Sequence, residues 1–156
     1  MIIRKMKTED YNSVHEIITQ VHNLHLENRS DIFNNQDPFN KGYFESLSND
    51  KNSILLVAEN SNEITGICIA TVNEIVNKPA HKDRKYICVE DICVDEKHRK
   101  NGIGKRLYQA IVEKAKEQKA EGIELTVYGF NKNAVSFYEG LGMNIKNIKY
   151  EQKLKT

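Results

Sequence analysis

Two glycines one residue apart, Gly102 and Gly104, stand in a basic stretch of the chain. Residues 96–106 contain five Lys or Arg side chains against one Glu. Glycine allows a backbone to approach a ligand closely, and the free N–H groups at the start of a helix attract anions. The stretch therefore predicts a cradle for a phosphate or pyrophosphate group. A glycine-rich helix start with a solvated basic face is the plainer alternative.

Two familiar nucleotide-binding patterns do not fit this loop. The P-loop has a Gly five residues before its Gly-Lys pair and a Ser or Thr after the Lys, but Arg99 and Arg106 occupy those positions. The dinucleotide-binding pattern has a third Gly three residues after the second, where Leu107 stands. What remains is Arg-x-x-Gly-x-Gly over residues 99–104, between a strand and a long helix.

Two adjacent carboxylates, Glu90 and Asp91, interrupt an otherwise apolar strand expected over residues 86–94. An unpaired charge is costly in such a strand, whereas a carboxylate beside a pocket can take a proton from an amine, directly or through water. Neighbours on a strand face opposite sides, so both reach one pocket only if the strand bulges. The alternative, which we favour for Asp91, is pairing with surface cations or a position where the sheet opens to water.

Hydrophobic periodicity predicts the elements that must position these residues. Apolar residues spaced by three and four predict a helix after Thr8, which can cap it, and a longer one from about Gly102 to Lys119, closed by Gly122. Shorter helices are expected near residues 40–48 and over 133–141. The expected strands cover residues 2–6, a hairpin over 54–72, 86–94, 123–130, and one or two more within 143–154.

This order predicts an α/β (α+β) fold: a mixed, mostly antiparallel central sheet of six to seven strands with helices on both faces. Residues 86–130 form a strand–helix–strand crossover, so their two strands should be parallel and the crossover right-handed.

Composition narrows the class of protein. With 156 residues the chain fits a single domain over residues 1–156. The net charge of +1 gives the chain no excess of positive charge that would favour a nucleic-acid partner. No run of apolar residues is long enough to span a membrane. Three cysteines without a metal-binding spacing predict reduced thiols, no metal and a cytoplasmic location.

Three segments resemble the GNAT superfamily of N-acetyltransferases. Residues 99–104, Arg-Lys-Asn-Gly-Ile-Gly, are similar to its acetyl-CoA loop. Glu90-Asp91-Ile92-Cys93-Val94 resembles its fourth strand, and Asn131-x-x-Ala134-x-x-Phe137-Tyr138-x-x-Leu141-Gly142-Met143 resembles the segment after its fifth. The departures are Met143, where Phe is commoner, and Lys100-Asn101, where Gly or a basic residue often follows the Arg. The region before residue 54, which shapes the acceptor site in such enzymes, matches no motif of the family, so the resemblance implies no acceptor-binding residues there.

The resemblance implies an acetyl-CoA-dependent N-acetyltransferase with direct transfer to a primary amine. Glu90 would be the base, with Asp91 or a water as alternatives, and Tyr138 would protonate the leaving thiolate. Asn131 could equally cap a helix or bond the amide chain of the cofactor. The positions implied for acetyl-CoA are Ile92, Cys93, Val94, Arg99, Lys100, Asn101, Gly102, Ile103, Gly104, Lys105, Asn131, Ala134, Phe137 and Tyr138.

The acceptor is expected to be an amine of a small molecule or a peptide. Glu74, Glu90 and Asp91 favour a cationic one, and placement alone suggests that Tyr43, Tyr128 and Phe130 line the acceptor side. A GNAT-like CoA-binding sensor or interaction module without catalysis is the alternative. The final strand is a candidate contact for a possible homodimer.

Overall fold

The computed structural model describes residues 1–155, which form two compact units, residues 1–126 and the residues from Val127 onward. The first unit holds one sheet with the strand order β1-β2-β3-β4-β5. Its strands are β1 (Ile2–Lys5), β2 (Ser53–Asn60), β3 (Glu63–Ile75), β4 (Arg84–Val94) and β5 (Gly122–Leu125).

The strand pairing confirms a mixed, mostly antiparallel sheet. The pairs from β1 to β4 are antiparallel, and β4 pairs with β5 in parallel, as the crossover over residues 86–130 predicts. The predicted count of six to seven strands is wrong, since the described residues form five. A two-residue turn, in which Ser61 and Asn62 both have positive φ, joins β2 to β3, as is usual where the turn must match the twist of a hairpin.

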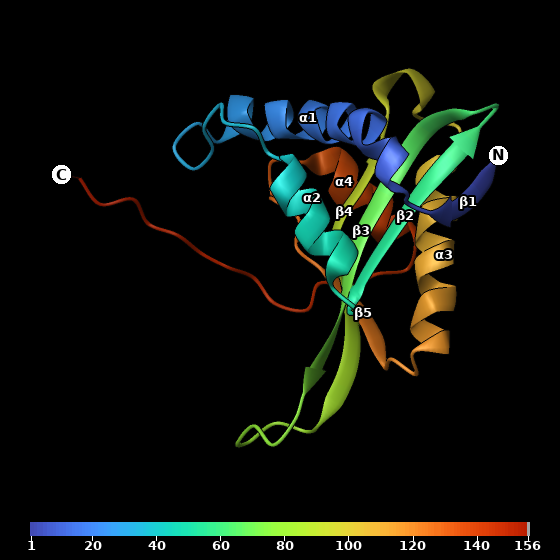
Figure 1. Cartoon of the computed structure of the whole chain (residues 1–156). Coiled ribbons are helices and arrows are strands. Elements are labelled where there is room, and N and C mark those ends of the chain that lie inside the picture. Colours follow the sequence, from blue (N-terminus) through green and yellow to red (C-terminus); the bar gives the residue numbers. More distant parts are fainter. Residues whose placement is uncertain (156) are drawn as a thin grey trace. The chain divides into compact units, whose positions relative to one another are not determined.

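Helices cover both faces of the sheet, as predicted (Figure 1). The helices α1 (Tyr11–Asn28) and α2 (Lys41–Asn49) pack on one face, and α3 (Ile103–Glu117) packs on the other. Alternation along β3 divides the core, because Ile67 and Ile69 join the α1–α2 side while Cys68 and Ala70 join the α3 side.

The end of α3 differs from the sequence prediction. Lys119 takes the left-handed conformation with φ 55°. The N–H of Lys119 donates to Lys116 and that of Ala120 donates to Ala115, which closes the helix with its own backbone. Gly122, expected to close this helix, instead begins β5.

The unit from Val127 onward contains α4 (Lys132–Gly140). Gly142 follows it with φ 88° and closes the helix as predicted. Residues 143–155 contain no helix or strand, and β5 ends at Leu125, so the strands predicted over 143–154 and 126–130 are corrected. An alternating pattern forms a strand only where a neighbour completes its hydrogen bonds.

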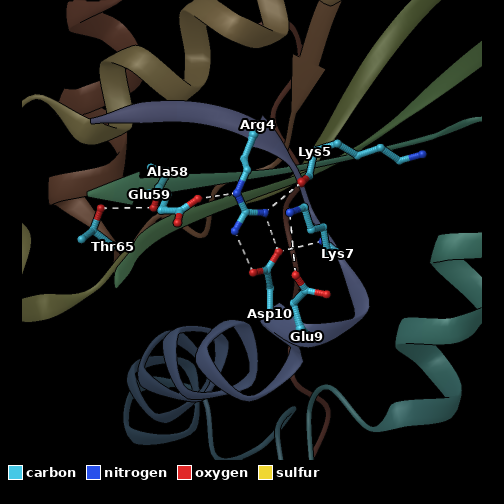
Figure 2. Close-up of polar contacts among 8 residues, drawn as sticks. All are labelled: Arg4, Lys5, Lys7, Glu9, Asp10, Ala58, Glu59 and Thr65. Carbon is cyan, nitrogen blue, oxygen red and sulfur yellow. Dashed lines mark hydrogen bonds and ion pairs between the residues drawn. The ribbon is translucent and has the colours of Figure 1, made fainter. Parts of the chain in front are cut away.

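A buried carboxylate ties β1 and β2 to the start of α1 (Figure 2). The Arg4 guanidinium donates to both oxygens of Asp10, at 2.8 and 2.9 Å, and its Nε donates to Glu59. A short 3-10 turn over Thr8–Asp10 precedes α1, and Lys7 rather than the predicted Thr8 is its N-cap residue. The side chain of Asp10, at the third position of this turn, reaches back to accept the N–H of Lys7 at 2.7 Å. The hydrogen bond from Arg4 is the main cause that lowers the pKa of Asp10 below its usual value.

We expect Asp10→Asn to lower the free energy of unfolding at pH 7 by about 2–3 kcal/mol, because Arg4 loses its buried charge partner. Since the pKa of Asp10 is lowered by folding, its contribution is present above the ordinary carboxyl pKa and is lost as the pH falls through the folded value. The difference between the two proteins should therefore shrink below about pH 4 in denaturant titrations. Glu9→Gln, at an exposed neighbour, is the control; an equal loss in both variants would contradict the prediction.

Candidate active site

A β-bulge in β4 lies at the acidic pair. Ala70 of β3 pairs with Val89, whereas the preceding Ile69 pairs with Asp91, so Glu90 is an extra residue in β4. Such an insertion breaks the alternation of a strand and redirects its side chains. Consequently Val89 packs with the α3 side of the core, while Asp91 lies opposite a residue of the α1–α2 side.

The bulge brings both carboxylates to the same side of the sheet. The hydroxyl of Thr71 donates to Glu90 at 3.3 Å. Thr71 pairs with Cys88, and both alternate with residues of the α3 side, so they face the α1–α2 side. Glu90 therefore lies on the side that Asp91 occupies, which is the arrangement that the sequence allowed only for a bulged strand.

The two carboxylates have different surroundings. Glu90 is exposed, whereas Asp91 is half-buried. This burial, and then the charge of Glu90, raise the pKa of Asp91 to about 6. Among residues 1–155 no Lys, Arg or His forms an ion pair with Asp91. Of the two positions expected for Asp91, pairing with a surface cation is not found among the described residues, and the position where the sheet opens to water stays a prediction.

An aromatic side chain of α2 lies near this pair. The pKa of Tyr43 is raised by burial and then by the charges of Asp91 and Glu90, which places the phenol within their field. Asn40 caps α2 by accepting the N–H of Tyr43 at 2.9 Å. The Tyr43 ring meets the buried Phe39 edge-on, with centroids 5.6 Å apart. The cap and the core therefore fix the aromatic ring beside the carboxylates.

The parallel pairing of β4 with β5 stops next to the bulge. The last registered pair is Val89 with Leu125. Within residues 1–126, the segment 90–94 therefore has a strand neighbour on one side only, which is β3. Successive backbone N–H groups of a strand point to opposite edges of that strand. The N–H groups of Ile92 and Val94 therefore point to one edge of β4, and that of Cys93 points to the other.

The predicted glycine loop leads into α3 with two left-handed residues. Lys100 has φ 63° and Gly102 has φ 75°, and α3 begins at Ile103. No side chain of the described residues caps the first turn of this helix, so its N–H groups are available to an anion. Arg99 donates to the carbonyl of Val94 at 3.2 Å, which joins the loop to the end of β4.

A glycine that sequence reasoning missed seats this loop on the sheet. A Cβ added at Gly66 of β3 would lie 2.9 Å from Ile103 Cγ2, 3.1 Å from Leu107 Cδ1 and 3.1 Å from the carbonyl oxygen of Cys93. The first turn of α3 can therefore pack directly on the backbone of the sheet. The available signal was a glycine within an apolar strand, which often marks such a close approach.

The remaining predicted residues lie in the second unit, on α4 and its cap. Asn131 accepts the N–H of Ala134 at 3.1 Å and thereby caps the helix, one of its two predicted roles. The rings of Phe137 and Tyr138 meet edge-on at 5.0 Å. In the same unit Tyr128 and Phe130 stack on each other at 5.7 Å.

Two other properties bear on the class of site. Over residues 1–155, no three His, Cys, Asp or Glu side chains are grouped as they would be around a metal ion. None of the described helices is both long and apolar enough to cross a membrane. Glu74, expected near the acidic pair, forms an ion pair with Lys85 at 3.1 Å instead.

Comparison with known proteins identifies the family. Residues 18–143 match the model of the acetyltransferase (GNAT) family, and the chain belongs to that family. It is therefore an acetyltransferase domain of the acetyl-CoA-dependent type, and the fold predicted from the resemblance is confirmed.

Three similar proteins illustrate the match. A solved variant of the BH1408 protein from Bacillus halodurans is 34% identical, with a TM-score of 0.96 over 99% of this chain and 100% of that one. The L-ornithine N5-acetyltransferase NATA1 of Arabidopsis thaliana is 32% identical over 69 residues, which are 44% of this chain and 30% of that protein. The aminoglycoside N-acetyltransferase AAC(6')-Iy, solved in complex with CoA, shares the fold at 12% identity, with a TM-score of 0.73 over 99% of this chain and 100% of that one.

Gly66→Ala should lower the free energy of unfolding by about 1–3 kcal/mol, because the new methyl group forces Ile103 and the start of α3 away from the sheet. Gly122→Ala is the matched control, since nothing lies within 4 Å of a Cβ added there. In the double variant Gly66→Ala/Ile103→Ala the cost should be less than the sum of the single costs. Additive costs in thermal denaturation would disprove the contact.

Proposed function

We propose that residues 1–156 form a single domain that transfers the acetyl group of acetyl-CoA directly to a primary amine of a cationic small molecule or peptide. The observation that carries this proposal is the bulge at Glu90. It brings two carboxylates to one side of the sheet, near Tyr43, at the point where β4 loses its pairing with β5.

Glu90 is the proposed base. An amine with a pKa near 10.4 must lose a proton before it attacks, which costs roughly 4–5 kcal/mol at pH 7. Glu90 is exposed and accepts a hydrogen bond from one hydroxyl, so its carboxylate is accessible to an incoming ammonium group. Asp91, whose pKa is raised to about 6, supplies a second negative charge that attracts the ammonium group at neutral pH.

The transfer itself would proceed as follows. Glu90 takes one proton from the ammonium group, and the neutral amine nitrogen then attacks the thioester carbon. Collapse of the tetrahedral intermediate breaks the C–S bond, and the second proton of the nitrogen passes to solvent. Backbone N–H groups among Ile92, Cys93 and Val94 would stabilise the oxyanion. Tyr138 would give its proton to the leaving CoA thiolate, and the products are an amide and CoA.

The cofactor is proposed to lie with its pyrophosphate on the backbone from Arg99 to Lys105, which includes Lys100, Asn101, Gly102, Ile103 and Gly104. The support is the uncapped first turn of α3 and the positive charge around it. Residues Asn131, Ala134 and Phe137 are proposed to contact the amide chain and thiol end of the cofactor.

A cationic acceptor is supported by the charge of the site. Glu90 and Asp91 give the site negative charge, and no described residue forms an ion pair with Asp91. Such a site favours a substrate that carries a positive charge. Two of the similar proteins described above are named for acceptors, ornithine and aminoglycosides, that carry more than one amine. We therefore expect polyamines, aminoglycosides or lysine side chains to be better substrates than an amino acid whose carboxylate cancels its positive charge.

Incubation with acetyl-CoA and a panel of amines, followed by mass spectrometry, should give an acetylated cationic amine. Glu90→Gln should lower kcat/KM for that amine by about 100-fold or more, which is the usual contribution of a general base. Glu113→Gln, at an exposed position of α3, is the control. Acetyl-CoA that binds but is never consumed would point to a binding module, and unchanged kcat/KM in Glu90→Gln would exclude Glu90 as the base.

Asp91→Asn should make the protein more stable and less active. Because folding raises the pKa of Asp91 from about 3.8 to about 6, the native state disfavours the carboxylate above that range, and stability falls as the pH rises through it. Asparagine removes the penalty, so the free energy of unfolding should increase by up to about 3 kcal/mol at pH 7.5 but change little at pH 4. A variant that loses both stability and activity at pH 7.5 would show that Asp91 has a structural role instead.

A further inference from the structure

Glu90, the residue that the bulge inserts into β4, has no partner of its own across the strand. Val89 and Asp91 are each paired with a residue of β3, and Glu90 between them is not. Its side chain is exposed, so holding it in one conformation costs entropy. A base nevertheless has to meet the proton at hydrogen-bond distance and in the right direction. A neighbouring group is therefore needed to orient this carboxylate.

The hydroxyl of Thr71 is placed to do this. Its Oγ1 donates a hydrogen bond to Glu90 Oε1 at 3.3 Å. A hydrogen bond to a carboxylate is stronger than one between neutral groups. Because it engages one of the two carboxylate oxygens, it sets the direction of the other, Oε2. The contact that fixes the side chain thus leaves an oxygen for an ammonium group.

Thr71 itself has little conformational freedom. It lies within β3, where it pairs with Ser53 of β2 and with Cys88 of β4. It is half-buried, and the side-chain amide of Asn73 donates to its carbonyl at 3.4 Å. A β-branched side chain on such a strand has few χ1 rotamers. Thr71 therefore offers Glu90 a donor whose position is determined by the sheet.

A neutral thiol borders the same carboxylate. Cys88, opposite Thr71, also faces the side of α1 and α2. Burial, and then the charge of Glu90, raise the pKa of the Cys88 thiol to about 11, so the thiol stays protonated at neutral pH. The cross-strand pair thus places a hydroxyl and an uncharged thiol beside Glu90. It adds no negative charge that would turn the carboxylate away.

We propose that Thr71 is a positioning residue for the reaction: its hydroxyl holds Glu90 by Oε1 and keeps Oε2 available to the amine of the acceptor. This inference rests on the proposed function, in which Glu90 is the base. Since the hydrogen bond sets the orientation of the carboxylate and not the charge of the site, its loss should lower kcat and leave KM for the amine nearly unchanged. A threonine that only packs in the sheet would instead affect stability at an unchanged kcat.

Thr71→Val keeps the shape of the side chain and removes the donor. With the amine found in the panel described above, kcat should fall about 10-fold while KM changes less than about twofold. Thr71→Ser, which restores the hydroxyl, should recover most of kcat. The matched control is Thr19→Val, which removes a hydroxyl that donates to the carbonyl of His15 within α1 and should keep the wild-type kcat. An unchanged kcat in Thr71→Val, or a loss that serine does not restore, would overturn the proposal.

The variant Glu90→Gln separates this inference from the proposed function. If Thr71 acts through Glu90, adding Thr71→Val to Glu90→Gln should lower kcat by less than about twofold more. The same loss in both backgrounds would show that Thr71 does not act through the base, and would leave Glu90 in its proposed role. An unchanged kcat in Glu90→Gln alone would contradict the proposed function itself.

Crystal structures test the contact without any acceptor. The wild-type protein should show Glu90 in one conformer, with Oε1 on the Thr71 hydroxyl, and Thr71→Val should show that side chain in more than one. A wild-type Glu90 that points away from Thr71 would disprove the contact. An identical Glu90 conformer in the valine variant would show that the hydroxyl does not orient it.

Discussion

The inserted residue in β4 is the constraint on which the rest of the site depends. Without it, Val89 and Asp91 would face the same side, and a carboxylate would enter the core beneath α3. With it, Val89 stays in that core while Glu90 and Asp91 both turn to the side of α1 and α2. The parallel register with β5 also ends at Val89. One backbone irregularity thus accounts for the pair of carboxylates and for the strand amides that lack a neighbour within the first unit.

The site is maintained at a cost in stability that other parts of the fold offset. Asp91 is a second carboxylate beside Glu90, half-buried and with no paired cation among the described residues, so its charged form is unfavourable in the native state. Elsewhere, buried charge is compensated, as at Asp10, which has two hydrogen bonds from Arg4 and one from Lys7. Asp10 has the environment of a structural carboxylate, because hydrogen bonds from other residues of the chain stabilise its charge. Asp91 lacks such partners in the described part of the chain, which is typical of a carboxylate that acts on a substrate.

Local patterns in the sequence predicted the glycine loop, the crossover and the two helical layers, because each depends on neighbours within a few residues. The sequence showed only that both carboxylates could face one pocket if the strand bulged. It could not show that the bulge exists, because the register of β4 is set by its partner strand β3. Gly66 escaped notice because its importance lies in a helix some forty residues further on, at Ile103. The strands predicted after residue 125 show the opposite error. Alternation at residues 148–154 describes a strand's faces but does not supply the neighbouring backbone that a strand needs.

The turn at Ser61 and Asn62 has a consequence for the order in which the molecule forms. It joins β2 and β3 through a tight reversal, and β4 then pairs with β3 after a short connection, so these pairings close small loops and carry little entropic cost. β1 must instead close a loop across both α1 and α2 to reach β2. During synthesis and refolding, the meander that contains the two carboxylates can therefore form before the N-terminal strand and before the crossover that carries the glycine loop.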